Sequence, residues 1–148
     1  MQTQIKEILA YKGGTVHRVS PSNTVAEAIQ VMNDLRIGAT VVMEGERLVG
    51  MFTERDVLTR VVPAGRDAPR MLVGEVMSTE LLVIKPTLTV EEAMQVVTEK
   101  KRRHLPVMDG GRLVGLISIG DLTRWLVREH ENEIETLLEY IGGPQPHH

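Results

Sequence analysis

The chain has 148 residues, of which 42% are hydrophobic and 25% are charged, the balance of one ordinary globular domain. Its net charge of −3 and its few aromatic side chains, one Trp, one Phe and two Tyr, argue against nucleic acid as a partner. It has no cysteine and no apolar run long enough to span a bilayer, so we expect a cytoplasmic protein with no membrane partner and no thiolate metal site.

The first predicted elements are helical. Residues 5–9 form a short apolar segment that we expect to be a helix. Beyond Pro21, apolar residues recur on one helical stripe: Val25, Ala28, Ile29 and Met32. Thr24 and Glu27 have the spacing of a capping box, which predicts the start of this helix.

A hairpin and a closing helix should follow. Residues 40–43 and 48–52 are β-branched or apolar, and the polar residues 44–47 between them indicate a loop. A shorter helix is expected from about Glu54 to Val62. Residues 63–70, rich in Pro and Gly, predict a linker before a short helix at 71–77, the counterpart of residues 5–9.

The same order then returns, because the chain is an internal duplication. Residues 19–59 align with 84–124 without a gap, and 15 of the 41 positions are identical. A closing helix is therefore expected from about Gly120 to Glu129. We predict an α/β (α+β) fold with two β-α-β-β-α repeats, 5–62 and 71–129, in one module over 1–148. Halves of about 60 residues bury little surface alone, so the repeats should pack sheet to sheet and share one core.

Residues 131–141 predict a C-terminal amphipathic helix. Its apolar residues fall at helical spacing: Ile134, Leu137, Leu138 and Ile141. Two partners suit this stripe, the rest of the same domain or a dimer interface. The histidines of the terminal Gln-Pro-His-His, residues 145–148, are left out of the functional reasoning.

Each repeat ends its last strand with a hydroxyl residue followed three positions later by Asp: Thr53 with Asp56, and Ser118 with Asp121. One interpretation is a capping box. The other is a ligand site, because the N–H groups at a strand-to-helix turn favour phosphate and an ionised Asp accepts hydrogen bonds from a ribose diol. The two interpretations are compatible, and a nucleotide would satisfy both halves of the motif.

Residues 100–103 are the densest positive run. They fit a solvated helix end at the negative pole of its dipole, or a phosphate site. His17 and His104 have no nearby cluster of acidic or Cys ligands, so we predict no metal.

These motifs resemble a tandem pair of CBS (cystathionine beta-synthase) domains, a Bateman module, over residues 5–128. The resemblance rests on the Gly-x-x-[Thr/Ser]-x-x-Asp ending of both repeats and on the Arg-His-Leu-Pro-Val run from Arg103. Lys12-Gly13-Gly14 and the Tyr140-Ile141-x-Gly ending are similar to the small free-standing bacterial type.

The resemblance implies a regulatory module that binds AMP, ADP or ATP, or sometimes NAD, in two clefts between the repeats. It implies that Asp56 and Asp121 hold ribose hydroxyls, with Thr53 and Ser118 against phosphate or ribose. Further lining residues are implied for the Asp121 cleft, Lys12, Thr15, His17, Ile37, Gly38 and Ala39, and for the Asp56 cleft, Met77, Glu80 and Leu82. Arg103, with His104 beside it, has the family's phosphate position.

The two clefts should not be equivalent. Gly38 stands in the first repeat where Arg103 stands in the second, and Val41 replaces the family's Pro. Arg55 precedes Asp56, whereas Gly120 precedes Asp121. The cleft with fewer cations is expected to bind its ligand more weakly or to take a different one.

The leading hypothesis is a nucleotide sensor that forms a homodimer, as the family commonly does, and acts on an unknown regulated protein. An enzyme with Asp121 or His104 as base would lack a nucleophile and base oriented by a third group, so we expect no catalysis and no catalytic cofactor. A ligand-free dimerisation module is the third hypothesis.

Overall fold

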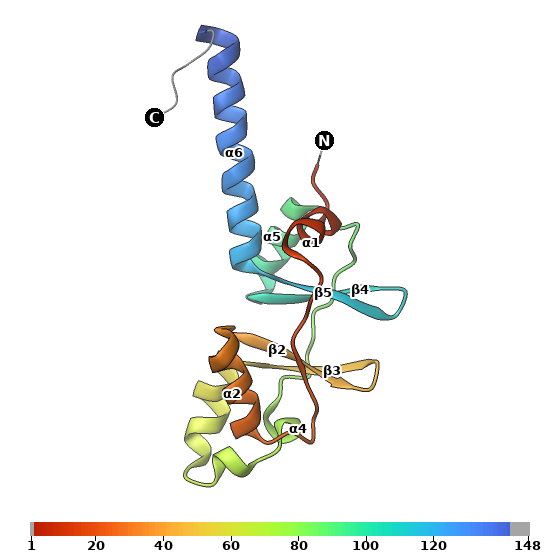
Figure 1. The fold of residues 1–148 in the computed structure, drawn as a ribbon, viewed down its shortest axis with the longest axis vertical. Helices are drawn as coiled ribbons and strands as arrows, with labels where there is room; N and C mark the ends of the chain where they lie inside the picture. The colour runs from red at the N-terminus through yellow and green to blue at the C-terminus, as the bar shows by residue number, and fades with distance from the viewer. Residues whose placement is uncertain (1, 143–148) are drawn as a thin grey trace.

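The computed structural model describes residues 2–142, and its order of elements follows the duplication (Figure 1). The first half contains α1 (Ile5–Lys12), β1 (Arg18–Val19), α2 (Val25–Leu35), β2 (Ala39–Glu44), β3 (Arg47–Thr53) and α3 (Glu54–Asp56). Helical turns of π and 3-10 type continue α3: η1 (Val57–Val61) and η2 (Val62–Ala64). The second half contains η3 (Ala68–Arg70), α4 (Val73–Val76), α5 (Val90–Lys100), β4 (His104–Asp109), β5 (Arg112–Ser118) and α6 (Ile119–Gly142).

The predicted capping boxes start α2 and α5. The Thr24 hydroxyl accepts from the Glu27 amide at 3.1 Å, and the Glu27 carboxylate accepts from the Thr24 amide at 3.1 Å. Thr89 and Glu92 form the same pair at the start of α5. Both helix starts are therefore set by local sequence, as expected.

The two repeats have separate small sheets. In the first, β1 pairs with β2 in parallel and β2 with β3 antiparallel. In the second, β4 and β5 form the hairpin, and the strand expected before α5 is reduced to one bridge, from Ile84 to Val107. Val83, just before the bridge, is 48% exposed and does not extend the ladder.

Each repeat contributes its leading helix to the other repeat. Ile5 and Ile8 of α1 are buried in the second repeat's cluster, where the Ile5 amide donates to the Leu88 carbonyl at 2.8 Å. Val73 and Val76 of α4 are buried in the first repeat's cluster. This exchange connects the two halves along their whole length.

The expectation of one shared core is corrected to two clusters with a sheet interface between them. Val42 and Phe52 face the helices of the first cluster. Val41, Met43 and Met51 are buried outside both clusters, and strand alternation puts them on the opposite face, towards the second sheet (Figure 1). The layers therefore run helix, sheet, sheet, helix.

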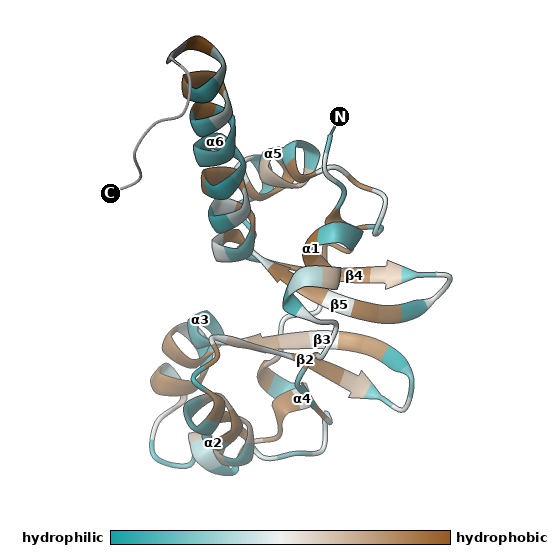
Figure 2. Cartoon of the chain, turned by 45° about the horizontal axis from the view of Figure 1, so that its top comes forward, coloured by the Kyte–Doolittle hydropathy of each residue, from teal (hydrophilic) through white to brown (hydrophobic). Residues whose placement is uncertain are grey.

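The break expected after Glu129 is also wrong, because α6 is one helix of 24 residues. Neither Gly nor Pro interrupts residues 121–141, and Glu and Leu, which favour helix, dominate its second half. Leu122 is fully buried near the start. Past residue 130 the helix leaves the body, with apolar and polar patches along it (Figures 1 and 2). Ile134 is 47% and Leu137 57% exposed, so this stripe does not pack on its own domain.

None of the helices within residues 2–142 has the length and apolar character needed to cross a membrane.

The packing of the exchanged helices on the sheets predicts unequal effects for two duplicated glycines. A Cβ at Gly50 would lie 2.9 Å from the Ser78 carbonyl oxygen, a backbone atom, as well as 2.6 Å from Met77 Sδ. The nearest atoms to a Cβ at Gly115 belong to the Leu9 side chain, from 2.5 Å. We expect Gly50→Ala to lower the free energy of unfolding by about 1–3 kcal/mol, and Gly115→Ala to lower it less. Urea denaturation checks this, and an equal or larger loss at Gly115 would contradict it.

Candidate functional site

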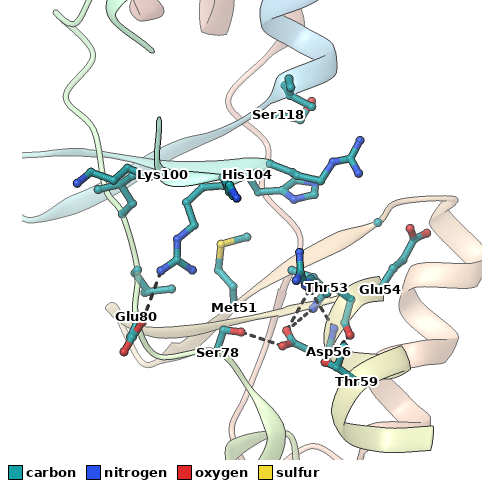
Figure 3. A pocket seen from close by; sticks show the side chains of 18 of the residues that line it. Met51, Thr53, Glu54, Asp56, Thr59, Ser78, Glu80, Lys100, His104 and Ser118 are labelled. Carbon is teal, nitrogen blue, oxygen red and sulfur yellow. Dashed lines mark hydrogen bonds and ion pairs between the residues drawn. The ribbon is translucent and has the colours of Figure 1, made fainter. Parts of the chain in front are cut away.

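A cleft of about 1120 Å³ lies between the two repeats (Figure 3). Its walls come from the β3 to α3 turn, the segment after α4, the end of α5 and the β5 to α6 turn. The chain segments that line it carry most of the residues singled out by sequence: Gly38, Thr53, Arg55, Asp56, Glu80, Leu82, Arg103, His104 and Ser118.

Asp56 is the buried carboxylate of this cleft and is only 4% exposed. Its Oδ2 accepts from the Thr53 amide at 2.9 Å and from the Thr53 hydroxyl at 3.1 Å, which is the capping-box arrangement. Its Oδ1 accepts from the Ser78 hydroxyl at 2.8 Å, and Arg60 Nε lies 3.8 Å away. Figure 3 shows Ser78 pointing at Asp56 from the opposite segment.

Asp121 has the same cap but different neighbours. The Ser118 amide and hydroxyl donate to its Oδ2 at 2.8 and 3.0 Å. Lys12 Nζ, from α1, also donates to Oδ2 at 2.7 Å and to the Leu116 carbonyl at 2.9 Å. Arg124 donates to Oδ1 at 2.8 Å. Both carboxylate oxygens of Asp121 are thus paired with a cation.

These contacts determine the ionisation of Asp121. Burial alone would raise the pKa of Asp121, but the hydrogen bonds from Lys12 and Ser118 and the Lys12 charge outweigh it, and the pKa lies below its ordinary value of 3.8. Asp121 is therefore an anion neutralised by the protein's own side chains. Asp56, in contrast, accepts from the neutral Ser78 hydroxyl at 2.8 Å, and its ion pair with Arg60 is longer, at 3.8 Å.

Positive charge is concentrated around the cleft. Six cationic residues line it against three carboxylates, in a chain whose net charge is −3: Arg55, Arg60, Lys100, Lys101, Arg102 and Arg103 against Glu54, Asp56 and Glu80. The contact of Arg102 with Glu80 is 3.7 Å long, and the Glu80 side chain is 92% exposed. The excess of cations suits an anionic ligand with several phosphate oxygens.

The cleft also reaches the start of α6, through Ser118, Ile119 and Gly120. The first amides of a long helix carry partial positive charge and favour an anion. Two of these amides already have partners: the Ile119 amide donates to the Arg103 carbonyl at 2.9 Å and the Asp121 amide to the Ser118 hydroxyl at 3.1 Å.

His104 lies half-buried at this end of the cleft. Burial is the main cause that lowers the pKa of His104 below its ordinary value of 6.5, and the neighbouring Arg103 lowers it further. A neutral imidazole offers one donor and one acceptor to a ligand.

Other residues implied by the resemblance lie elsewhere. Ile37 and Met77 pack against the first cluster. Ala39 is buried in β2, and Thr15 and His17 are exposed after α1. Gly38, which the resemblance assigns to the Asp121 cleft, lines the cleft that holds Asp56, and its carbonyl accepts from the Glu54 amide at 3.0 Å.

Three important neighbours were missed by sequence reasoning: Ser78, Arg60 and Arg124. Arg60 and Arg124 lie four and three positions beyond their Asp on a helix, a spacing that brings side chains together. Ser78 gave no signal, because it lies just after α4, in a segment where the two repeats differ in length and no longer align. Within residues 2–142, no three His, Asp or Glu side chains form a group that could hold a metal ion.

The chain is similar in sequence to known proteins. A family model described as CBS domain matches the chain twice, at residues 15–63 and 73–128. The CBS domain-containing protein CBSX3, mitochondrial, of Arabidopsis thaliana is 35% identical over 150 residues, which cover 95% of this chain and 73% of that protein. The CBS domain-containing protein YhcV of Bacillus subtilis is 40% identical over 118 residues, 80% of this chain and 81% of that protein.

The fold agrees with this match. A crystal structure of a CBS domain superposes with a TM-score of 0.82 at 36% identity, covering 86% of this chain and 99% of that one.

The ion pair at Asp121 predicts the effect of Lys12→Met, which removes the charge and keeps an apolar side chain. The pKa of Asp121 should rise, because two interactions that lower it come from Lys12. A carboxyl whose pKa is depressed by folding stabilises the protein above its unfolded pKa, and this stability is lost as pH falls through the folded pKa. Acid unfolding of the variant should therefore begin at higher pH.

Carbon-13 NMR of the Asp121 carboxyl and melting curves at acid pH measure both effects. Lys6→Met, on the exposed side of the same helix, is the matched control. An unchanged Asp121 titration in the Lys12 variant would contradict the role given to the ion pair.

His104 predicts a second pH effect. Its folded pKa is below 6.5, so as pH falls through 6.5 the unfolded chain takes up a proton first and the folded state loses stability until the folded pKa is passed. His104→Gln should remove this loss. Urea unfolding at about pH 7.5 and about pH 5.5 measures it, and the same pH dependence in both proteins would refute the assignment.

Proposed function

The chain belongs to the CBS-domain family, and on that premise we propose that it is a regulatory sensor that binds an adenine nucleotide in the cleft beside Asp56. A tandem CBS pair implies a regulatory module. The observation that carries the finer proposal is the cleft itself, which six cations line together with the buried acceptor carboxylate of Asp56, in a chain of net negative charge.

The ribose would lie on Asp56. A ribose diol offers two O–H donors, and an ionised carboxylate accepts only. The Ser78 hydroxyl fills one acceptor position of Asp56 at 2.8 Å. We propose that a ligand hydroxyl replaces it, so the capping pair from Thr53 stays intact when the ligand binds.

The phosphates would lie towards the second repeat. Arg103, Arg102 and Lys101 line that wall, and the amides at the start of α6 lie beside them. Apolar side chains from three segments, Met51, Leu58, Leu81 and Leu82, offer a surface for the adenine. AMP, ADP and ATP all fit this chemistry, and the number of cations favours those with more phosphate groups.

The Asp121 site is proposed to be the weaker one. Lys12 and Arg124 already neutralise its carboxylate at 2.7 and 2.8 Å, so a ribose hydroxyl would have to displace a cation. The sequence predicts that the two clefts differ. We propose two causes: the residues that contact each carboxylate, and the presence of Arg103 in one repeat where the other has Gly38.

NAD is the second candidate, because its two phosphates also suit the cationic wall and the cleft is long enough to join both turns. A module that only dimerises, without ligand, is the alternative of a different class. No catalytic role is proposed.

A ligand panel separates these functions. Binding to the folded state alone raises the free energy of unfolding by RT ln(1 + [L]/Kd), about 2.7 kcal/mol at a hundredfold excess over Kd. We expect the melting temperature to rise with AMP, ADP or ATP, and mass spectrometry of the native protein to identify the nucleotide that co-purifies. A larger rise with NAD would favour the dinucleotide. No rise with any of them, and no bound nucleotide, would leave the dimerisation module.

Arg103→Ala tests the phosphate wall. Loss of one charge-assisted contact should weaken ATP binding by about tenfold, measured by calorimetry, and weaken adenosine binding less. Arg112→Ala is the matched control, since Arg112 is exposed in the same repeat and is not among the cleft residues. Equal losses in the two variants would contradict the proposed phosphate position.

Asp56→Asn tests the ribose position. Asn keeps the size of the side chain but presents one acceptor oxygen in place of two. We expect the wild type to prefer ATP over 2′-deoxy-ATP, and the variant to lose most of this preference. An unchanged preference would place the ribose elsewhere, and melting curves without ligand report any loss of the helix cap.

A further inference from the structure

The free part of α6 has a regular pattern with a seven-residue period. Val127, Ile134 and Ile141 are each seven residues apart, and all three are β-branched and about half or more exposed. His130 and Leu137 fall three residues after Val127 and Ile134. These are the a and d positions of a heptad, the seam through which two helices pack.

The remaining positions fit the same pattern. The residues at the b, c and f positions, which point away from a partner helix, are all polar: Arg128, Glu129, Asn132, Glu135, Thr136 and Glu139. The e and g positions that flank the seam hold two carboxylates, Glu131 and Glu133, followed by two apolar residues, Leu138 and Tyr140. Polar and apolar residues are therefore separated as in a coiled coil and not scattered.

We propose that residues 127–141 of α6 form a parallel two-stranded coiled coil with the same segment of a second copy of this chain. β-branched residues at a with Leu at d favour two parallel strands. In a parallel pair, each g residue faces the e residue five positions further along the partner. Glu133 then faces Leu138, and Leu126 faces Glu131, so no two carboxylates meet across the seam.

The helix is already formed before a partner arrives. A free segment of 15 residues would be marginal as a helix, because nucleation is costly. Here the start of α6 is packed on the rest of the domain. Leu122 is fully buried, the ring centroids of Trp125 and Tyr11 are 6.1 Å apart, and Arg128 Cζ lies 4.4 Å from the Tyr11 centroid. Association therefore does not carry the cost of forming the helix.

The seam is also open to a partner. Leu122 and Leu126 mark the side of α6 that packs on the body, and Glu129 on that side bonds to Thr3. At 100° per residue, the stripe from Val127 to Ile141 lies roughly a third of a turn away from that side. A second helix can lie along it without displacing the body, past which α6 extends (Figure 1).

Disulfide trapping tests the orientation, because the chain has no cysteine of its own. In a parallel pair, Val127→Cys alone and Ile141→Cys alone should each give a cross-linked dimer under mild oxidation with diamide. Asn132→Cys, at an outward f position, should give none. Cross-linking only when the Val127 and Ile141 variants are mixed would indicate an antiparallel pair and would overturn the proposal. No cross-linking at either position would show that the helices do not pack through this seam, and would overturn it too.

Sedimentation velocity tests the energetics on the full chain. Ile134→Glu with Leu137→Glu places charge in the seam and should weaken self-association by about tenfold or more. Asn132→Glu with Thr136→Glu adds the same charge to the outer face and should leave association unchanged. All four positions are exposed, so melting curves should show that both variants stay folded. Equal association of the seam variant and the wild type would overturn the proposal.

Discussion

The exchange of leading helices between the two repeats is the interaction on which the rest of the structure depends. α1 is buried against the second repeat and α4 against the first, so neither repeat has a complete core without the other. The same exchange brings Lys12 to Asp121 and Ser78 to Asp56. Each site is thus finished by a residue from the other half of the chain, and folding and site assembly are one event.

The duplication has been kept in the backbone and altered in the side chains that meet the carboxylates. Both Asp residues close the same cap, with a hydroxyl and an amide from Thr53 or Ser118. The differences lie in the residues that contact the carboxylates: two cations lie within 2.8 Å of Asp121, whereas Asp56 has the Ser78 hydroxyl at 2.8 Å and a cation, Arg60, only at 3.8 Å. Two sites with one geometry can in this way differ in the ligand charge that they tolerate.

Local features of the fold could be predicted from sequence, and features made by distant contacts could not. The caps at Thr24 and Thr89 depend on residues three apart, so spacing alone identified them. The two hairpins follow from short apolar runs around turn residues in the same way. The family resemblance supplied the two Asp and Arg103.

The exchange of helices and the position of Ser78 depend on contacts between residues far apart in the chain. Local patterns in a single sequence do not predict such contacts. The separation of α6 into two helices failed for a simpler reason. The change from a buried stripe to an exposed stripe suggests two helices, although no Gly or Pro interrupts residues 121–141. Because α6 begins at the cleft, is packed on the second repeat and continues unbroken to residue 142, it moves with that repeat: a helix of 24 residues is roughly 36 Å long, and a tilt of the repeat by about 10° would move the far end of α6 by about 6 Å.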